Sequence, residues 1–118
     1  EKLSVDLFSA GVGIGKFNGG GMMQVPDANP VNGCFHITII RNLGIWGILL
    51  NFLKLYNGSF VSDYRVSTHT GTQVQLSSEK PLSGEVDGES IGNSNFNLKI
   101  IPHQLRVIYG EDKFKMLE

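Results

Sequence analysis

Residues 34–40 read CFHITII, and this stretch decides the fold of the chain. Its odd positions carry phenylalanine and isoleucine, while the even positions between them carry histidine and threonine. Successive side chains of a β-strand point to opposite faces of a sheet, so a period of two indicates a strand with one buried face. We therefore expect residues 34–40 to form a core strand.

Residues 43–56 follow this strand and show a different period. Their apolar side chains recur at spacings of three and four residues, which places them on one face of a helix. These side chains are Ile45, Ile48, Leu49, Phe52, Leu53 and Tyr56. Asn57-Gly58 then supplies a helix stop. The apolar face has two interpretations: it closes the open end of a β-sandwich, or it lines an acyl-chain pocket or contacts a bilayer through Trp46.

Alternating or apolar runs elsewhere predict further short strands. These runs lie at residues 3–9, 22–25, 64–70, 72–76, 82–86, 97–101 and 104–109. The runs at 64–70 and 72–76 are joined through Gly71 and are expected to pair as a hairpin. With about eight short strands, one amphipathic helix and no βαβ alternation, the sequence predicts a mainly β fold, an antiparallel β-sandwich or open barrel. We assign residues 1–110 to this domain and residues 111–118 to a C-terminal tail.

The composition is that of one globular domain. The chain has 118 residues and a mass of 12.9 kDa, with a hydrophobic fraction of 41% and a net charge of -1 at pH 7. These values favour a single packed core and do not favour nucleic acid as a partner. Glycine is enriched, at 15 residues, as expected for tight turns between short strands.

The single cysteine bears on the compartment. Cys34 cannot form an internal disulfide, so a reducing, cytoplasmic compartment is the default. The longest apolar stretch, residues 43–55, falls short of the roughly 20 residues that a bilayer span needs, so we expect no spanning helix. The chain begins at Glu1 without a methionine, and we expect a fragment of something longer.

The glycine-rich stretch at residues 11–21 does not carry a nucleotide-binding motif. A Walker loop would need glycine where Ala10 stands and a magnesium-binding hydroxyl where Phe17 stands. The dinucleotide fingerprint fails because its third glycine is replaced by Asn18. The run Gly19-Gly20-Gly21 could cradle an anion, but by itself it favours a sharp bend.

The remaining polar residues give no signature of metal or hydrolase chemistry. His36, His69 and His103 are far apart and have no metal-binding spacing, so we expect surface or hydrogen-bonded histidines. No Gly-x-Ser-x-Gly elbow presents a nucleophilic serine.

Three acidic residues close together leave two interpretations open. In one extended strand, Glu85, Asp87 and Glu89 would share a face and stack their carboxylates. Such a cluster could take a proton from a substrate hydroxyl or meet a magnesium nucleotide. Alternatively, Asp87-Gly88 is a hairpin turn with solvated acids on either side, which is the simpler interpretation of the tripeptide alone.

An ordered set of short motifs carries a family resemblance. The set consists of Gly19-Gly20-Gly21-Met22, Pro26-Asp27-Ala28, Asn32-Gly33, Asp87-Gly88-Glu89 and Ile101-Pro102. In order, spacing and intervening helix, it resembles the C-terminal domain of the diacylglycerol kinase and sphingosine kinase superfamily, in its bacterial lipid-kinase branch. The resemblance covers roughly residues 3–109, and the specificity lies in the set rather than in any one motif.

The resemblance implies a function. Such domains pack against an N-terminal nucleotide-binding domain, with the active site in the cleft between, and the family transfers the γ-phosphoryl of ATP to a lipid hydroxyl with Mg²⁺. By this analogy Glu89 matches the proton acceptor, with Asp87 beside it as the second catalytic candidate. A carboxylate near the acceptor hydroxyl can take its proton as the new bond to phosphorus forms.

The resemblance also implies a metal site. Bacterial members hold a structural magnesium in the loop after the Pro-x-Ala segment, through an Asp carboxylate and main-chain carbonyls. The matching position here is Asn32, with Asn29 and Cys34 supplying the carbonyls. A neutral amide is a weaker ligand for a hard dication than a carboxylate, so we expect weak or absent binding.

The leading hypothesis is the lipid-acceptor half of a lipid kinase that is cytoplasmic and peripheral at the inner membrane surface. The fragment alone should be inactive, because the nucleotide-binding domain is missing. The alternatives are a stand-alone β-sandwich module that binds a small ligand or a partner protein, and a degenerate regulatory domain of the same family. The identity of the acceptor lipid and the formation of a homo-oligomer stay open.

Overall fold

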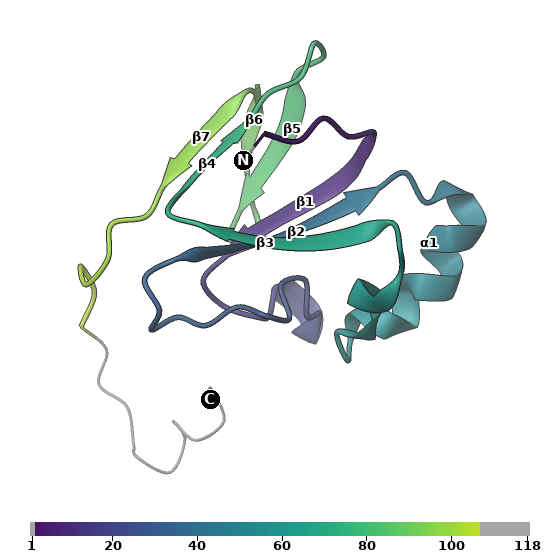
Figure 1. Cartoon of the computed structure of the whole chain (residues 1–118), viewed down its shortest axis with the longest axis horizontal. Coiled ribbons are helices and arrows are strands. Elements are labelled where there is room, and N and C mark those ends of the chain that lie inside the picture. Colours follow the sequence, from purple (N-terminus) through teal and green to yellow (C-terminus); the bar gives the residue numbers. More distant parts are fainter. Residues whose placement is uncertain (1, 107–118) are drawn as a thin grey trace.

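The computed structural model describes residues 2–106, which form mainly antiparallel β-structure (Figure 1). The larger sheet has the strand order β1-β2-β3, with strands Leu7–Gly13, Phe35–Arg41 and Val66–Gly71. The other strands form two pairs, β4 (Gln73–Leu76) with β7 (Phe96–Lys99) and β5 (Leu82–Val86) with β6 (Glu89–Ser94). The predicted mainly β, antiparallel fold is confirmed.

The helical elements lie between β1 and β3. One α-helix, α1 (Gly44–Phe52), follows β2 and continues into the 3₁₀ segment η2 (Leu53–Leu55). Two further 3₁₀ segments are η1 (Gly19–Gly21) and η3 (Ser59–Ser62). The helix predicted at residues 43–56 is therefore confirmed, with its last turn tightened to 3₁₀ geometry.

Strand β2 is the centre of the larger sheet and supplies much of its core. It pairs on one side with β1 and on the other with β3, both antiparallel. Its side chains Ile37 and Ile39 are buried, as the alternation predicts. Thr38, on the opposite parity, is buried as well, because the segment at residues 25–28 covers that face. The buried apolar side chains among the described residues are Val25, Ala28, Ile37, Ile39 and Phe60.

The predicted hairpin of residues 64–70 with 72–76 is wrong. Strand β3 pairs with β2, and β4 pairs with β7, so the two neighbours in sequence lie in different sheets. Only Thr72 separates β3 from β4. A hairpin connection normally needs at least two residues, so the chain instead bends from one sheet into the next (Figure 1).

The other strand predictions differ at their edges. The first strand begins at Leu7 rather than at residue 3, because its register with β2 ends at Arg41, where the chain leaves the sheet. Residues 22–25 form no strand, and Met22 makes only an isolated β-bridge with Asn18. Residues 104–106 form no strand, and residues 107–109 lie outside the described residues, as do Gly110 and the tail.

Helix α1 is fixed to the sheet through small and polar residues. Its buried residues are Gly47 and Asn51. Asn51 Nδ2 donates to the carboxylate of Asp63, which also accepts from Arg65 Nε at 3.0 Å and Nη2 at 2.9 Å. These hydrogen bonds from Arg65 hold the pKa of the Asp63 carboxyl well below its ordinary value of 3.8. The pKa of the Arg65 guanidinium is raised in turn.

Several apolar side chains of α1 are exposed. Ile45 is 83% exposed, Trp46 77%, Leu50 72% and Leu53 76%. The apolar face predicted from the periodicity is therefore divided. Ile48 and Phe52 line an apolar pocket against the fold together with Ile40 and Phe60, whereas Ile45 and Leu53 remain in solvent. The Arg65 guanidinium occupies the space beside Gly47, where an added Cβ would lie 3.1 Å from Nη1.

Candidate functional site

The tripeptide Asp87-Gly88-Glu89, here named the acidic turn, joins strands β5 and β6. Val86 pairs with Glu89, which leaves Asp87 and Gly88 as the two residues of the loop. Both have positive φ, 50° and 86°, as the two central residues of a type I′ hairpin turn require. The hairpin-turn interpretation of Asp87-Gly88 is therefore correct.

The turn separates the three carboxylates that one extended strand would have stacked. Glu89 is the cross-strand partner of Val86, and Glu85 is that of Ser90. Directly opposed residues share a face, and adjacent residues point to opposite faces, so the side chains of Glu85 and Glu89 lie on opposite faces of the hairpin. The interpretation as a stack of three carboxylates is wrong, whereas Asp87 and Glu89 remain neighbours at the tip.

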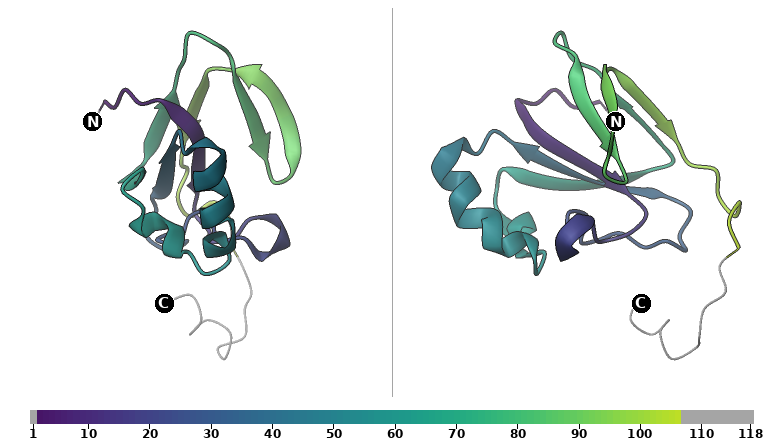
Figure 2. Two further views of the ribbon diagram at one scale, coloured as in Figure 1. Left: turned by 90° about the vertical axis from the view of Figure 1, so that its right-hand side faces the viewer. Right: turned by 180° about the vertical axis from the view of Figure 1, so that it is seen from behind.

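Both candidate catalytic residues are open to a partner. Asp87 and Glu89 are exposed, and neither side chain makes a hydrogen bond or ion pair with another residue in the range 2–106. Figure 2 shows the turn end of the β5–β6 hairpin on the same side of the larger sheet as the Gly19–Gly21 turn. The sequence did not predict this shared side, whereas the exposed tip agrees with the hairpin-turn interpretation.

The hairpin is held by close packing rather than by charge. A Cβ added at Gly84 would overlap Cζ of Phe96 and lie 3.0 Å from Cγ1 of Ile91. The Phe96 ring of β7 therefore lies directly over the backbone of β5. This contact fixes the β5–β6 pair against the β4–β7 pair and so positions the acidic turn.

The predicted metal loop is closed by its own hydrogen bonds. Asn32 Oδ1 accepts from the backbone N–H of Cys34 at 3.0 Å, and Asn29 Oδ1 accepts from that of Val31 at 3.1 Å. The Asn32 amide nitrogen lies 2.7 Å from Nε2 of His36. Since an amide nitrogen can only donate, Nε2 is the acceptor of this hydrogen bond.

These residues do not fit a magnesium ion. The loop at residues 29–34 contains no carboxylate, and both polar atoms of the Asn32 side chain are already engaged. A hard dication prefers charged oxygen ligands. Within residues 2–106 there is also no group of three or more His, Cys, Asp or Glu side chains that could hold a metal ion. Weak or absent binding stays a prediction, with this geometry as its reason.

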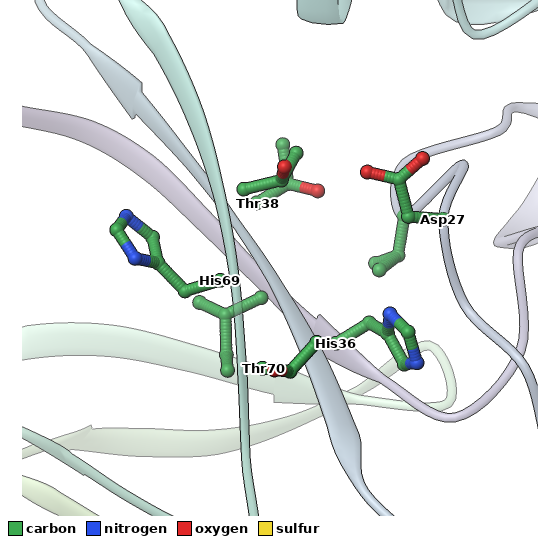
Figure 3. Close-up of a pocket in the computed structure, with 8 residues that line it drawn as sticks. Asp27, His36, Thr38, His69 and Thr70 are labelled. Atoms are coloured by element: carbon green, nitrogen blue, oxygen red, sulfur yellow. The ribbon is translucent and has the colours of Figure 1, made fainter. Parts of the chain in front are cut away.

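A pocket of about 150 Å³, here named the polar pocket, lies where residues 25–28 meet the larger sheet. Thr38 is paired with Thr68, and His36 with Thr70, so these four side chains share one face. The lining residues are Val25, Asp27, His36, Ile37, Thr38, Thr68, His69 and Thr70. Figure 3 shows Asp27 and His36 on one side of the pocket and His69 on the opposite side.

Sequence reasoning missed this pocket. In the sequence Asp27 stands out only as part of the Pro26-Asp27-Ala28 motif, and Thr38 only as a polar position of a predicted strand. The expectation for His36 is confirmed, because it is a buried and hydrogen-bonded histidine, and His69 Nε2 lies 3.2 Å from the Ser67 hydroxyl. The pocket depends on cross-strand register, which no single stretch of sequence displays.

Comparisons with known proteins agree with one another. The model of the family described as the YegS C-terminal NAD kinase beta sandwich-like domain matches residues 3–109. Proteins named probable lipid kinase YegS-like, from Yersinia pestis (strain Pestoides F) and Yersinia pseudotuberculosis serotype O:1b (strain IP 31758), are each 25% identical over 103 residues. The match covers 87% of this chain and 33% of each relative, so the chain spans about a third of their length. No solved structure matches the chain significantly.

No helix within residues 2–106 is long and apolar enough to cross a bilayer.

Proposed function

This chain belongs to the family of YegS C-terminal NAD kinase beta sandwich-like domains, and on that basis we propose that it forms the lipid-acceptor side of an ATP-dependent lipid kinase. The observation that carries the proposal is the family match over residues 3–109, together with relatives named as probable lipid kinases. Membership in a lipid-kinase family follows from these matches, whereas the acceptor role, the catalytic residues and the cofactors are part of the proposal.

Glu89 is the proposed proton acceptor, with Asp87 beside it. In phosphoryl transfer the protein mainly positions the reactants, and a carboxylate within reach of the acceptor hydroxyl can take its proton as the bond to phosphorus forms. The exposure of both side chains at the hairpin tip supports this role, since a buried or paired carboxylate could not meet a substrate held by another domain.

The proposed partner is an N-terminal nucleotide-binding domain that precedes these residues in the same protein. The chain spans 33% of the relatives' length, which leaves room in them for such a domain. ATP and Mg²⁺ would bind mainly there, and Mg²⁺ would offset the charge on the phosphates. By itself the 118-residue chain is then expected to be inactive, because none of its motifs cradles a triphosphate.

The proposed membrane contact is the outer face of α1. Ile45, Trp46, Leu50 and Leu53 are each more than 70% exposed, and residues 44–53 contain no charged side chain. A helix with an exposed apolar face that includes tryptophan is suited to lie in a bilayer interface. Lipid substrates reside there, so this face would bring the acceptor side of the enzyme to them.

The test is phosphoryl transfer from radiolabelled ATP to lipid by the longer protein that includes the nucleotide-binding domain. We expect Glu89→Gln to lower kcat by about 100-fold or more, the usual contribution of a general base. Glu79→Gln is the matched control, because Glu79 is also exposed but lies in the loop between β4 and β5. A loss below about tenfold at Glu89 would make the proton-acceptor role untenable and favour a simple turn.

A further inference from the structure

The side chain of Asn32 joins two parts of the chain. Its Oδ1 accepts from the backbone N–H of Cys34 at 3.0 Å, which closes a turn of the Asx type. Its Nδ2 lies 2.7 Å from Nε2 of His36 and donates to that atom. His36 is 8% exposed on β2, the central strand of the larger sheet, so this bond ties the loop to the core. We name these two hydrogen bonds together the Asn32 clasp.

A second Asn-Gly turn in the same chain shows what the clasp adds. Asn57 Oδ1 accepts from the backbone N–H of Ser59 at 2.9 Å, and the glycines that follow Asn32 and Asn57 have φ of 70° and 74°. Both asparagines are exposed. The Nδ2 of Asn57 makes no hydrogen bond with another residue in the range 2–106. The turn itself therefore needs only the side-chain oxygen, and the bond from Nδ2 to His36 is an addition in the loop at residues 29–34.

The groups that the clasp joins suit an amide and do not suit a cation. Cys34 presents an N–H, which requires an acceptor, and His36 presents a ring nitrogen, which here requires a donor. The single amide of Asn32 supplies both. A magnesium ion needs oxygen ligands, whereas the Nδ2 of an asparagine is a donor and offers no lone pair to a cation. The other side-chain oxygen of the loop, Asn29 Oδ1, already accepts from the N–H of Val31 at 3.1 Å.

We propose that the Asn32 clasp replaces a structural cation in this chain, so that residues 29–36 keep their shape without a divalent ion. The resemblance implies a carboxylate in this loop, and Asn32 stands at the matching position. Asp27 and His36 lie on the same side of the polar pocket (Figure 3), so the clasp also fixes this side of the pocket by hydrogen bonds alone. The proposal does not rest on the kinase function, and it concerns the fold rather than an ion that arrives with a nucleotide.

The test compares thermal unfolding of the 118-residue chain, followed by circular dichroism, in excess EDTA, in MgCl₂ and in CaCl₂ at equal ionic strength. We expect the same Tm in every solution. Asn32→Ala removes both bonds of the clasp and should lower Tm by about 5–10 °C in each solution. Asn57→Ala is the matched control, because it removes only the bond of the turn and should lower Tm by about half as much.

A second measurement uses the unmodified chain and so does not depend on the folding of a variant. The side-chain amide protons of Asn32 should exchange with water about three- to tenfold more slowly than those of Asn57, with or without Mg²⁺, because only the former donate to a protein acceptor. The proposal is overturned if Mg²⁺ or Ca²⁺ raises the Tm of the unmodified chain in a saturable way and Asn32→Ala abolishes this rise. It is also overturned if Asn32→Ala lowers Tm no more than Asn57→Ala does, or if the two side-chain amides exchange at equal rates.

Discussion

Helix α1 and the polar pocket depart from the usual rule of burial in opposite directions. The helix leaves Ile45 and Trp46 83% and 77% exposed, whereas the pocket buries the unpartnered hydroxyl of Thr38 to 1% exposure. Each arrangement costs stability in an isolated domain, through apolar surface left in water and through a desolvated polar group. Both lie on elements next to the same strand, since β2 contains Thr38 and leads directly into α1.

The two regions are suited to different kinds of binding partner. Contiguous exposed apolar surface marks a contact with another apolar body, such as a membrane or a protein. A buried polar group without a partner marks a contact with a small polar one.

The largest expected effect concerns the exposed apolar face of α1. Trp46→Ser combined with Leu50→Ser removes two side chains that are each more than 70% exposed on α1. If they insert into a bilayer, their loss should weaken binding to vesicles of phosphatidylglycerol and phosphatidylethanolamine by about 100-fold, as measured by cosedimentation.

The control for this change is Ile101→Ser, since Ile101 is 69% exposed but follows β7, away from the helix. Equal vesicle binding by the double variant and the unmodified chain would contradict the membrane contact. In that case the outer face of α1 would bind another protein. A change in the self-association of the double variant would show that this protein is a second copy of the chain.

How far the sequence predicted these regions depends on the range of the interactions. The period of two found β2, and the period of three to four found α1, because both signals are local. The same pattern did not show which part of the apolar face stays exposed, since the attachment of α1 depends on Arg65 and Asp63 from a distant segment. Strand β6 was missed because its sequence ESIGNS lacks the apolar alternation of a half-buried strand.

The sites show the same limit. The acidic turn was found because Asp-Gly is a local hairpin signal, but one-strand geometry placed Glu85 on the wrong face relative to Glu89. The polar pocket was not found because Thr38 faces Thr68 across the sheet and Asp27 enters from a loop. Pairings between distant segments cannot be read from periodicity alone.

The contact between Gly84 of β5 and Phe96 of β7 is a third region, in which the packing is close. Gly84→Ala places a methyl group against the Phe96 ring, where an added Cβ would overlap Cζ. Overpacking of this kind should lower the free energy of unfolding by about 1–3 kcal/mol in urea titration. Gly15→Ala is the control, because a Cβ there meets nothing within 4 Å. An unchanged stability of Gly84→Ala would mean that the hairpin is not held through this contact.

The attachment of α1 gives a smaller effect that depends on pH. Arg65 lowers the pKa of Asp63 in the folded chain, so the folded state binds that proton more weakly than the unfolded state does. The pair therefore stabilises the fold at pH values above about 4, and this contribution is lost as the pH falls below that value. Asp63→Asn should lower Tm at pH 7 by about 5 °C, with a difference that shrinks toward pH 2. A difference that grew on acidification would contradict the assignment.

The smallest expected effect bears on the polar half of the comparison. Thr38→Val replaces the unpartnered hydroxyl with a methyl group of similar size, so no hydrogen bond between described residues is lost and the desolvation cost of the hydroxyl disappears. The free energy of unfolding should rise by up to about 1 kcal/mol, as measured by urea titration. A loss of stability in Thr38→Val would mean that the hydroxyl has a structural partner, and the contrast between the pocket and α1 would then reduce to the helix alone.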